Sequence, residues 1–473
     1  MRTKFTGLLI FLLFGPTFAQ SFTPQGWLED FEQLKHEMSS HYANLEWAVA
    51  ERGIDLKRLS ADTAAKIREA KSDAEARIAI DNFLRAFGDG HLRAEWTTSP
   101  TSAAVQADSG TICQRLGYRS RPLRQGIDLT PLAGFKAIDS AESRIIPSGS
   151  GILPNGKRFG LVSIRLFDDS VFPELCEAAV SEMKLAADSQ CDEGCEERVR
   201  SSTSNRYVAA LTAQVERLNK EKIDVLLVDL TGNGGGNDVY QPMARTLTAV
   251  PLRSPNAGFV RHPHWAKQNR EKLADLEAEI QKASGEMRRK LKLAAEAARR
   301  DLAEAEKPCD LSPLWENRKA NCSLVVAFAK SPVPYAKPGE LSNTALGNIY
   351  FSASRYEYRE GVFRGKLVVL VDPRTASSSE AFAAMLRDNN AARVIGYPTL
   401  GAGCGYTNGG VPATLKKSGA RVRMPDCVRL RADGANEING VTPDVFVPWR
   451  QNDSEYQRAR RVVDTLNIVT KSF

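Results

Sequence analysis

A strand, a turn of small residues and a helix follow one another at residues 367–387, and the turn carries three consecutive serines. The apolar run 367–371 is followed by Asp-Pro-Arg-Thr-Ala-Ser-Ser-Ser-Glu at 372–380 and then by a segment of helical character at 381–387. Such an arrangement places a serine hydroxyl at the N-terminus of a helix, where the peptide dipoles favour negative charge. This is a suitable setting for a nucleophile. The alternative is that Thr375 or Ser379 only caps the helix.

A glycine cluster forms the second segment that could take part in chemistry. The sequence Leu-Thr-Gly-Asn-Gly-Gly-Gly-Asn at 230–237 follows the apolar run 223–229 and opens a predicted helix. Glycines allow backbone N–H groups to approach a ligand closely. A phosphate-binding loop is excluded, because no Gly-Lys-Ser or Gly-Lys-Thr follows and the spacing does not match Gly-x-Gly-x-x-Gly. The cluster therefore predicts either an oxyanion hole or a tight turn.

Four motifs, taken in order, resemble a known family. They are Asp-Leu-x-x-Asn-x-Gly-Gly at 229–236, Thr-Ala-Ser-Ser-Ser-Glu at 375–380, Pro-Thr-Leu-Gly at 398–401 and Gly-Val-Thr-Pro-Asp at 440–444. Together they resemble the core of the C-terminal-processing peptidases, the tricorn core proteases and the interphotoreceptor retinoid-binding protein modules. The resemblance implies a crotonase-like α/β core, of the ClpP/crotonase type, and Ser377 as the nucleophile of a serine peptidase. No Gly-Leu-Gly-Phe-like loop occurs between residues 96 and 155, so a PDZ domain is not expected.

The branches of this family differ in the group that activates the serine. In the processing-protease branch the base is a lysine after the Pro-Thr motif, and the matching position here is Ala402. The tricorn-like branch takes its base from a histidine before the core, and Phe-Gly-Asp-Gly-His at 87–91 resembles the turn that carries it. The resemblance therefore implies His91 as the general base, a role that suits imidazole because its ordinary pKa is about 6.5. The remaining histidines lie in the N-terminal helical stretch or at the start of a helical insertion: His36, His41, His262 and His264.

The same branch orients its histidine with a glutamate, and the matching residue is Glu437 in Glu-Ile-Asn-Gly-Val-Thr-Pro-Asp at 437–444. It also has a serine just before the histidine, where this sequence has Gly90. The link from His91 to Glu437 must then be direct, through water, or through another residue such as Asp89. An ordinary loop carboxylate is the alternative for Glu437.

These residues predict nucleophilic acyl transfer on a peptide or protein substrate. Ser377 attacks a peptide carbonyl, the N–H groups of Gly234, Gly235 and Ser378 hold the oxyanion, and water then hydrolyses the acyl-enzyme. Two other functions stay open. The missing lysine and the missing relay serine leave open a non-catalytic module that binds an apolar ligand or a peptide, and an esterase would use the same nucleophile.

The predicted elements divide the chain into a helical N-terminal domain at 20–95, an irregular segment with some strands at 96–155, an α/β core at 156–450 and a C-terminal helix at 451–473. Buried strands are expected at 159–166, 223–229, 323–328, 367–371, 393–396 and 444–447, with helices between them. Within the core, apolar residues at spacings of three and four predict a helical insertion at 262–308. The insertion is a homo-oligomerisation arm, a lid or a helical pair that packs on its own domain.

Composition and the N-terminus indicate where the protein works. A net charge of +7 over 473 residues, without a dense basic stretch that includes aromatics, argues against a nucleic-acid partner. Residues 1–19 predict a signal peptide, whose apolar run at 8–14 falls short of the ~20 residues that span a bilayer. We therefore expect an exported protein, periplasmic or secreted, without stable membrane insertion.

Eight cysteines in an exported chain favour disulfides. The pairs that would close short loops are Cys309–Cys322 and Cys404–Cys427. Cys191 and Cys195 lack a second ligand pair at zinc-binding spacing, so no metal and no cofactor are expected.

Overall fold

The computed structural model describes residues 22–96, 110–327, 332–407 and 412–471, so the predicted signal peptide lies outside the described residues. Four helices form the N-terminal region: α1 (Pro24–His41), α2 (Leu45–Ala50), α3 (Leu56–Glu69) and α4 (Asp73–Ala86). The apolar residues spaced three and four apart all point inward, and Phe31, Leu34 and Phe83 are almost fully buried. The helical pattern of the sequence is therefore confirmed in this region.

A seven-stranded sheet forms the centre of the molecule, in the order β13-β9-β8-β5-β4-β3-β2. The strands are β2 (Lys136–Ala137), β3 (Ser148–Ile152), β4 (Arg158–Ser163), β5 (Val225–Asp229), β8 (Lys366–Val371), β9 (Arg393–Gly396) and β13 (Val445–Phe446). The five strands from β4 to β13 run parallel, whereas β3 and β2 join antiparallel at one end. Every residue of β5 is buried, as expected for a parallel strand that is covered on both faces.

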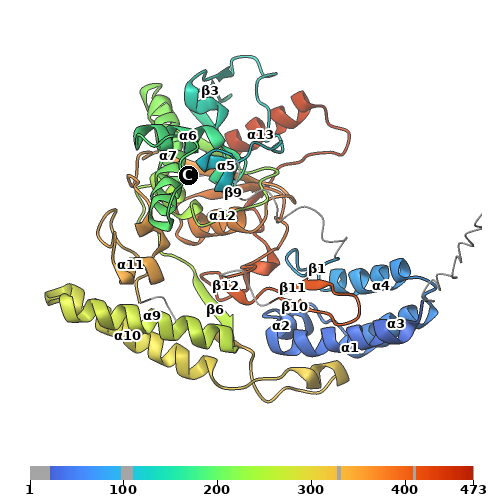
Figure 1. Ribbon diagram of the computed structural model, residues 1–473. Coiled ribbons are helices and arrows are strands. Elements are labelled where there is room, and N and C mark those ends of the chain that lie inside the picture. Colours follow the sequence, from blue (N-terminus) through green and yellow to red (C-terminus); the bar gives the residue numbers. More distant parts are fainter. Residues whose placement is uncertain (1–21, 97–109, 328–331, 408–411, 472–473) are drawn as a thin grey trace, which may run out of the picture.

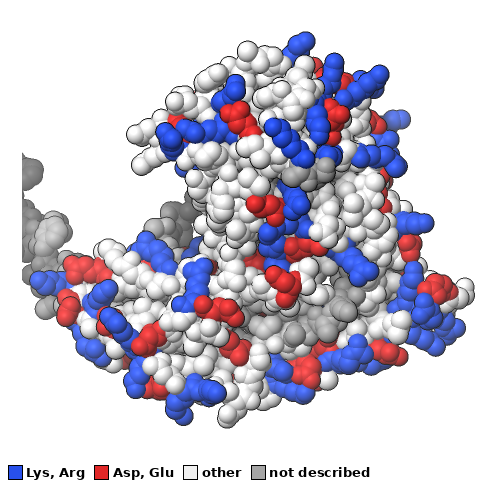
Figure 2. Space-filling model, turned by 180° about the vertical axis from the view of Figure 1, so that it is seen from behind, with Lys and Arg blue, Asp and Glu red and all other residues white. Residues whose placement is uncertain are grey.

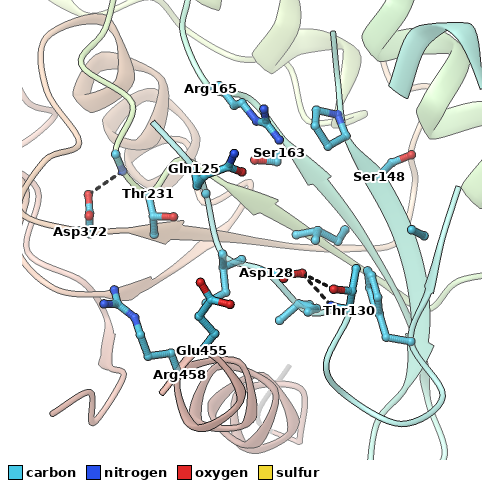
Figure 3. A pocket seen from close by; sticks show the side chains of 18 of the residues that line it. Gln125, Asp128, Thr130, Ser148, Ser163, Arg165, Thr231, Asp372, Glu455 and Arg458 are labelled. Atoms are coloured by element: carbon cyan, nitrogen blue, oxygen red, sulfur yellow. Dashed lines mark hydrogen bonds between the residues drawn. The ribbon is translucent and has the colours of Figure 1, made fainter. Parts of the chain in front are cut away.

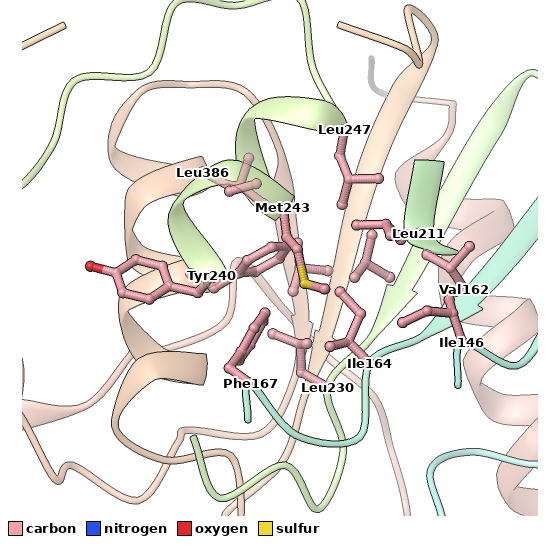
Figure 4. Close-up of a cluster of buried hydrophobic side chains, with 14 of the residues drawn as sticks. Ile146, Val162, Ile164, Phe167, Leu211, Leu230, Tyr240, Met243, Leu247 and Leu386 are labelled. Carbon is pink, nitrogen blue, oxygen red and sulfur yellow. The ribbon is translucent and has the colours of Figure 1, made fainter. Parts of the chain in front are cut away.

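Helices cover both faces of this sheet (Figure 1). On one face lie α7 (Glu193–Lys220), α8 (Tyr240–Thr246) and α12 (Ser378–Asp388), whose side chains meet those of the strands in the cluster of Figure 4, which includes Val162, Leu211, Met243 and Leu386. On the other face, α13 (Glu455–Val469) packs against Leu161, Leu227 and Leu370. Each fully buried leucine contributes ~1.5–3 kcal/mol of transfer free energy.

Two small sheets lie beside the central one and connect it to the N-terminal helices. One contains β1 (Arg93–Glu95), β11 (Arg421–Arg423) and β10 (Ala413–Thr414), and the other contains β12 (Cys427–Leu430), β6 (Asn256–Val260) and β7 (Val325–Ala327). The run 323–328 was expected to be a buried strand. The strand is confirmed by β7, but it pairs with β6 in the second small sheet and not with the central sheet; Phe328 lies outside the described residues.

The apolar pattern of 262–308 forms a helical hairpin, α9 (Pro263–Lys282) and α10 (Gly285–Ala305), at the lower left of Figure 1. Its buried side chains, including Leu276 and Leu291, pack with α11 (Ala345–Tyr350) and with Phe351. The apolar stripe is therefore covered by the hairpin's own surroundings. A role in homo-oligomerisation stays a prediction.

The described residues include all eight cysteines, which form four disulfides, and none of these cysteines is free. Cys309–Cys322 and Cys404–Cys427 confirm the two expected short loops. The others are Cys191–Cys195, at the start of α7, and Cys113–Cys176, which joins α5 (Ile112–Arg115) to α6 (Pro173–Glu182).

Within the described part of the chain, no helix is long and apolar enough to cross a membrane. On the face in Figure 2, basic and acidic side chains are interspersed over most of the surface.

Candidate active site

Ser377 lies at the turn between β8 and α12, immediately before the first residue of the helix. Its backbone angles are φ 55° and ψ −119°, a conformation that L-residues rarely adopt and that costs about 1–3 kcal/mol. Two charged side chains hold the backbone of Ser377 in place. Its N–H donates to Glu380 Oε2 at 2.7 Å, and its carbonyl accepts from Arg429 Nη2 at 3.3 Å.

Glu380 connects the serine turn to the segment at 399–402. Its carboxylate also accepts from the N–H groups of Gly401 at 2.6 Å and Ala402 at 2.9 Å, and from the Thr399 hydroxyl at 2.5 Å. Glu380 is fully buried, and burial raises its pKa while the hydroxyl and N–H donors oppose the shift. From the sequence, Glu380 was only the last residue of the motif at 375–380, and its hydrogen bonds to the segment 399–402 were not predicted.

His91 is held by the same segment. Its Nδ1 lies 2.7 Å from the carbonyl oxygen of Ala402. A carbonyl can only accept, so Nδ1 carries the proton and Nε2 is left as the basic nitrogen. Burial lowers the pKa of His91 below its ordinary value of 6.5, although Asp89 and the bond to Ala402 act in the opposite direction. The neutral imidazole that a general base requires is therefore favoured.

A continuous path of hydrogen bonds thus runs from the Ser377 N–H through Glu380 and Ala402 to His91. Among the described residues, no hydrogen bond joins the Ser377 hydroxyl to His91 directly. In enzymes without bound substrate this contact is often long, and it tightens when the complex forms.

Gly405 contacts the edge of the His91 ring. A Cβ at this position would lie 2.9 Å from His91 Nε2, and the residue has a φ of +75°. We expect Gly405→Ala to displace the imidazole and to lower kcat at least tenfold, while the backbone strain costs only about 1 kcal/mol of stability. Gly434→Ala is a matched control, since Gly434 has a φ of +86° but no atom within 4 Å of the added Cβ. Equal activity in the two variants would contradict this account of His91.

Asp89 fixes the backbone around His91 and does not contact the imidazole nitrogens. Its Oδ1 accepts from the His91 N–H at 2.9 Å, and its Oδ2 accepts from Tyr42 and Asn44, each at 3.0 Å. The Asn44 amide oxygen in turn accepts from Asn436 at 2.9 Å. The N-terminal helices therefore take part in shaping the turn that carries His91.

The glycine cluster meets the serine turn. A Cβ on Gly235 would lie 2.7 Å from Ser377 Cβ, so only glycine fits there. However, the Gly235 N–H donates to Asn233 Oδ1 at 2.9 Å and is already engaged. Gly234 is exposed, and its N–H donates to no other described residue. Ser378 is the first residue of α12, so its N–H has no partner within the helix.

Glu437 lies in a different setting from the one expected. It is 1% exposed, and both its oxygens accept from Arg429, with distances from 2.6 to 3.0 Å. No hydrogen bond or ion pair connects it with His91 among the described residues. Arg429 also donates to the Gly403 carbonyl at 2.9 Å, so the pair braces both the serine turn and the segment that holds His91. A guanidinium and a carboxylate that are buried together compensate each other's lost hydration, which accounts for the position of Glu437 beside Arg429.

Comparison with known proteins identifies the family and the fold of this chain. The sequence pattern of peptidase family S41 matches residues 199–447, which is more than half of the chain. The fold is similar to that of mature CPAF complexed with lactacystin, with a TM-score of 0.60 and 14% identity over 95% of this chain and 98% of that one. A second structure of mature CPAF gives a TM-score of 0.57 at 14% identity, over 95% and 97% of the two chains. The chain belongs to peptidase family S41.

Proposed function

We propose that this protein is a serine endopeptidase that cleaves peptide bonds through an acyl-enzyme on Ser377, with His91 as the general base. The observation that carries the proposal is the path from Ser377 through Glu380 and Ala402 to His91, which leaves Nε2 as an acceptor. Membership of a peptidase family supports the serine-type chemistry.

In the proposed reaction, His91 Nε2 takes the proton of the Ser377 hydroxyl while Oγ attacks the substrate carbonyl. The oxyanion accepts from the N–H groups of Ser378 and Gly234, and the Asn233 side chain holds the neighbouring Gly235 in place. His91 then donates its proton to the leaving amine, and the acyl group stays on Ser377. Water, deprotonated by the same imidazole, hydrolyses the ester in the second half of the reaction.

In this proposal the carbonyl of Ala402 orients the imidazole of His91. A carbonyl can hold the Nδ1–H tautomer as a carboxylate does, but without its negative charge. Glu437 then acts through Arg429 as a positioning residue. We also infer that the core is crotonase-like and that the protein is exported, which its four disulfides support.

The pKa of His91 sets the expected pH dependence. The base must be neutral, and burial lowers its pKa below 6.5. We therefore expect kcat/KM to be constant around pH 7 and to fall as the pH decreases through a value below 6.5. Asp89 raises this pKa, so Asp89→Asn should move the acidic limb to lower pH. A limb that stays in place in this variant would argue against His91 as the titrating base.

The test of the proposed function is labelling of the purified mature protein with a fluorophosphonate probe, followed by assays on casein and on a short-chain ester. A peptidase should label and cleave casein. Labelling with ester cleavage alone would favour an esterase. Absence of labelling would overturn the proposal and favour a non-catalytic binding module.

A further inference from the structure

A cavity of about 630 Å³ lies at the carboxyl ends of β4, β5 and β8, on the face of the sheet that α13 covers. Its walls come from the loop 125–130, from the residues just after the three strands, and from Trp449 and Arg458 near and on α13 (Figure 3). Neither Ser377 nor His91 lines it. The cavity is therefore separate from the candidate active site.

The loop that forms one wall is held against the sheet. The Ile127 N–H donates to Asp229 Oδ2 at 2.8 Å, and Asp229 also accepts from Ser163 and from Thr231. A Cβ on Gly126 would lie 2.1 Å from Asp229 Oδ2, so glycine is required for this close approach. The wall is thus fixed by buried bonds, and the cavity exists without a ligand.

Three arginines line the cavity without a carboxylate partner among the described residues: Arg165, Arg374 and Arg458. Arg165 is partly buried whereas the other two are exposed, and its Nε is buried and has no hydrogen-bond partner among the described residues. A buried guanidinium nitrogen without an acceptor loses its hydration and gains nothing in return. Arg458 lies over the Trp449 ring, with its guanidinium carbon 5.2 Å from the ring centroid.

The acidic residues of the cavity do not neutralise these arginines by direct contact. Asp128 accepts from the N–H and the hydroxyl of Thr130, and Asp372 accepts from the N–H groups of Gly232 and Arg374. Glu455 is exposed on the first turn of α13. The formal charges of the three arginines and the three acidic residues balance. The buried group that lacks a hydrogen-bond partner, however, is a donor, the Nε–H of Arg165.

Apolar side chains complete the lining, namely those of Ile127, Leu129, Phe135, Leu161 and Trp449. A ligand that fits must therefore carry both a negatively charged hydrogen-bond acceptor and an apolar group. We propose that this cavity binds an organic carboxylate with an aromatic or aliphatic group, whose carboxylate pairs with Arg165. The carboxylate can belong to a free small acid or to the end of a polypeptide. This inference does not depend on the proposed peptidase activity.

Calorimetric titration of the mature protein with phenylpropionate, and with phenylpropanamide as its neutral counterpart, tests the proposal. The acid should bind at least tenfold more tightly than the amide. Arg165→Gln should weaken binding of the acid by about tenfold to a hundredfold and leave the amide unchanged, because a charge-assisted hydrogen bond is lost. Arg121→Gln is the matched control, since Arg121 pairs with Asp168 and does not line the cavity.

Arg458→Gln provides a second variant, because Arg458 is exposed and its loss should not affect folding. It should also weaken binding of the acid, by a smaller factor. A short acetylated peptide that ends in phenylalanine, compared with its C-terminal amide, separates the two sources: binding of the peptide acid supports a polypeptide end, and binding of phenylpropionate alone supports a free acid. Equal affinity for acid and amide, or equal loss in Arg121→Gln and Arg165→Gln, would overturn the proposal.

Discussion

Ser377→Ala should reduce the rate of peptide hydrolysis by about a million-fold and leave the protein folded. The reason is that the variant removes the attacking oxygen but keeps the backbone bonds to Glu380 and Arg429, which use the N–H and carbonyl of residue 377. The hydroxyl donates to no described residue but accepts from the Glu380 N–H as the N-cap of α12, so its loss should lower the unfolding free energy by about 0.5–2 kcal/mol. Initial rates on casein and a thermal melt measure the two quantities.

The adjacent serine provides a matched control. Ser379 is fully buried, and its hydroxyl has no hydrogen-bond partner among the described residues. Ser379→Ala should therefore keep full activity and be neutral or slightly stabilising. If Ser379→Ala lost activity as completely as Ser377→Ala, the assignment of the nucleophile to the first serine of the cluster would not stand.

Glu437→Ala should destabilise the protein by about 3–5 kcal/mol, because it leaves the Arg429 guanidinium buried without its carboxylate. Activity should fall as well, since Arg429 braces the carbonyls of Ser377 and Gly403. Urea unfolding and kcat/KM, measured below the transition, report the two effects. A glutamate that only oriented the histidine would give the opposite pattern, with a large loss of kcat and little loss of stability.

The double variant Arg429→Met with Glu437→Leu separates charge from packing. Removing both charges together avoids the uncompensated guanidinium, so the double variant should recover much of the stability that Glu437→Ala loses. Its activity should stay low, because the two braced carbonyls have lost their donor. Recovery of activity together with stability would indicate that the pair has no positioning role.

The strands and the turn that carries Ser377 could be predicted from the sequence because both depend on local pattern. The run 223–229 is apolar enough to predict a strand that is buried on both faces, and β5 covers residues 225–229 of it. The run 323–328 has the same local character, but nothing in six residues tells which sheet a strand will join. Its pairing with β6 depends on a hairpin insertion that brings the two segments together.

Residues of the candidate site that belong to a local motif could be predicted from the sequence. Residues that are placed by hydrogen bonds between distant segments could not. Motifs marked Ser377 and the glycine cluster as candidates, and a short turn did so for His91. Arg429 follows Cys427 in an ordinary strand, and no local signal marks it as the partner of Glu437. The carbonyl of Ala402 could not be found from side-chain types at all, because the bond to His91 uses the backbone.

The disulfide Cys404–Cys427 ties the segment that holds His91 to the strand that carries Arg429. Closing a loop of this length limits the unfolded chain and is worth about 3 kcal/mol in the chain-entropy picture. A thiol reductant in the assay buffer would reduce this disulfide, which lies next to the proposed base. Assays with reductant would therefore report on the reduced protein, and assays without it on the oxidised protein. A weak activity in the presence of reductant would say little about the oxidised form.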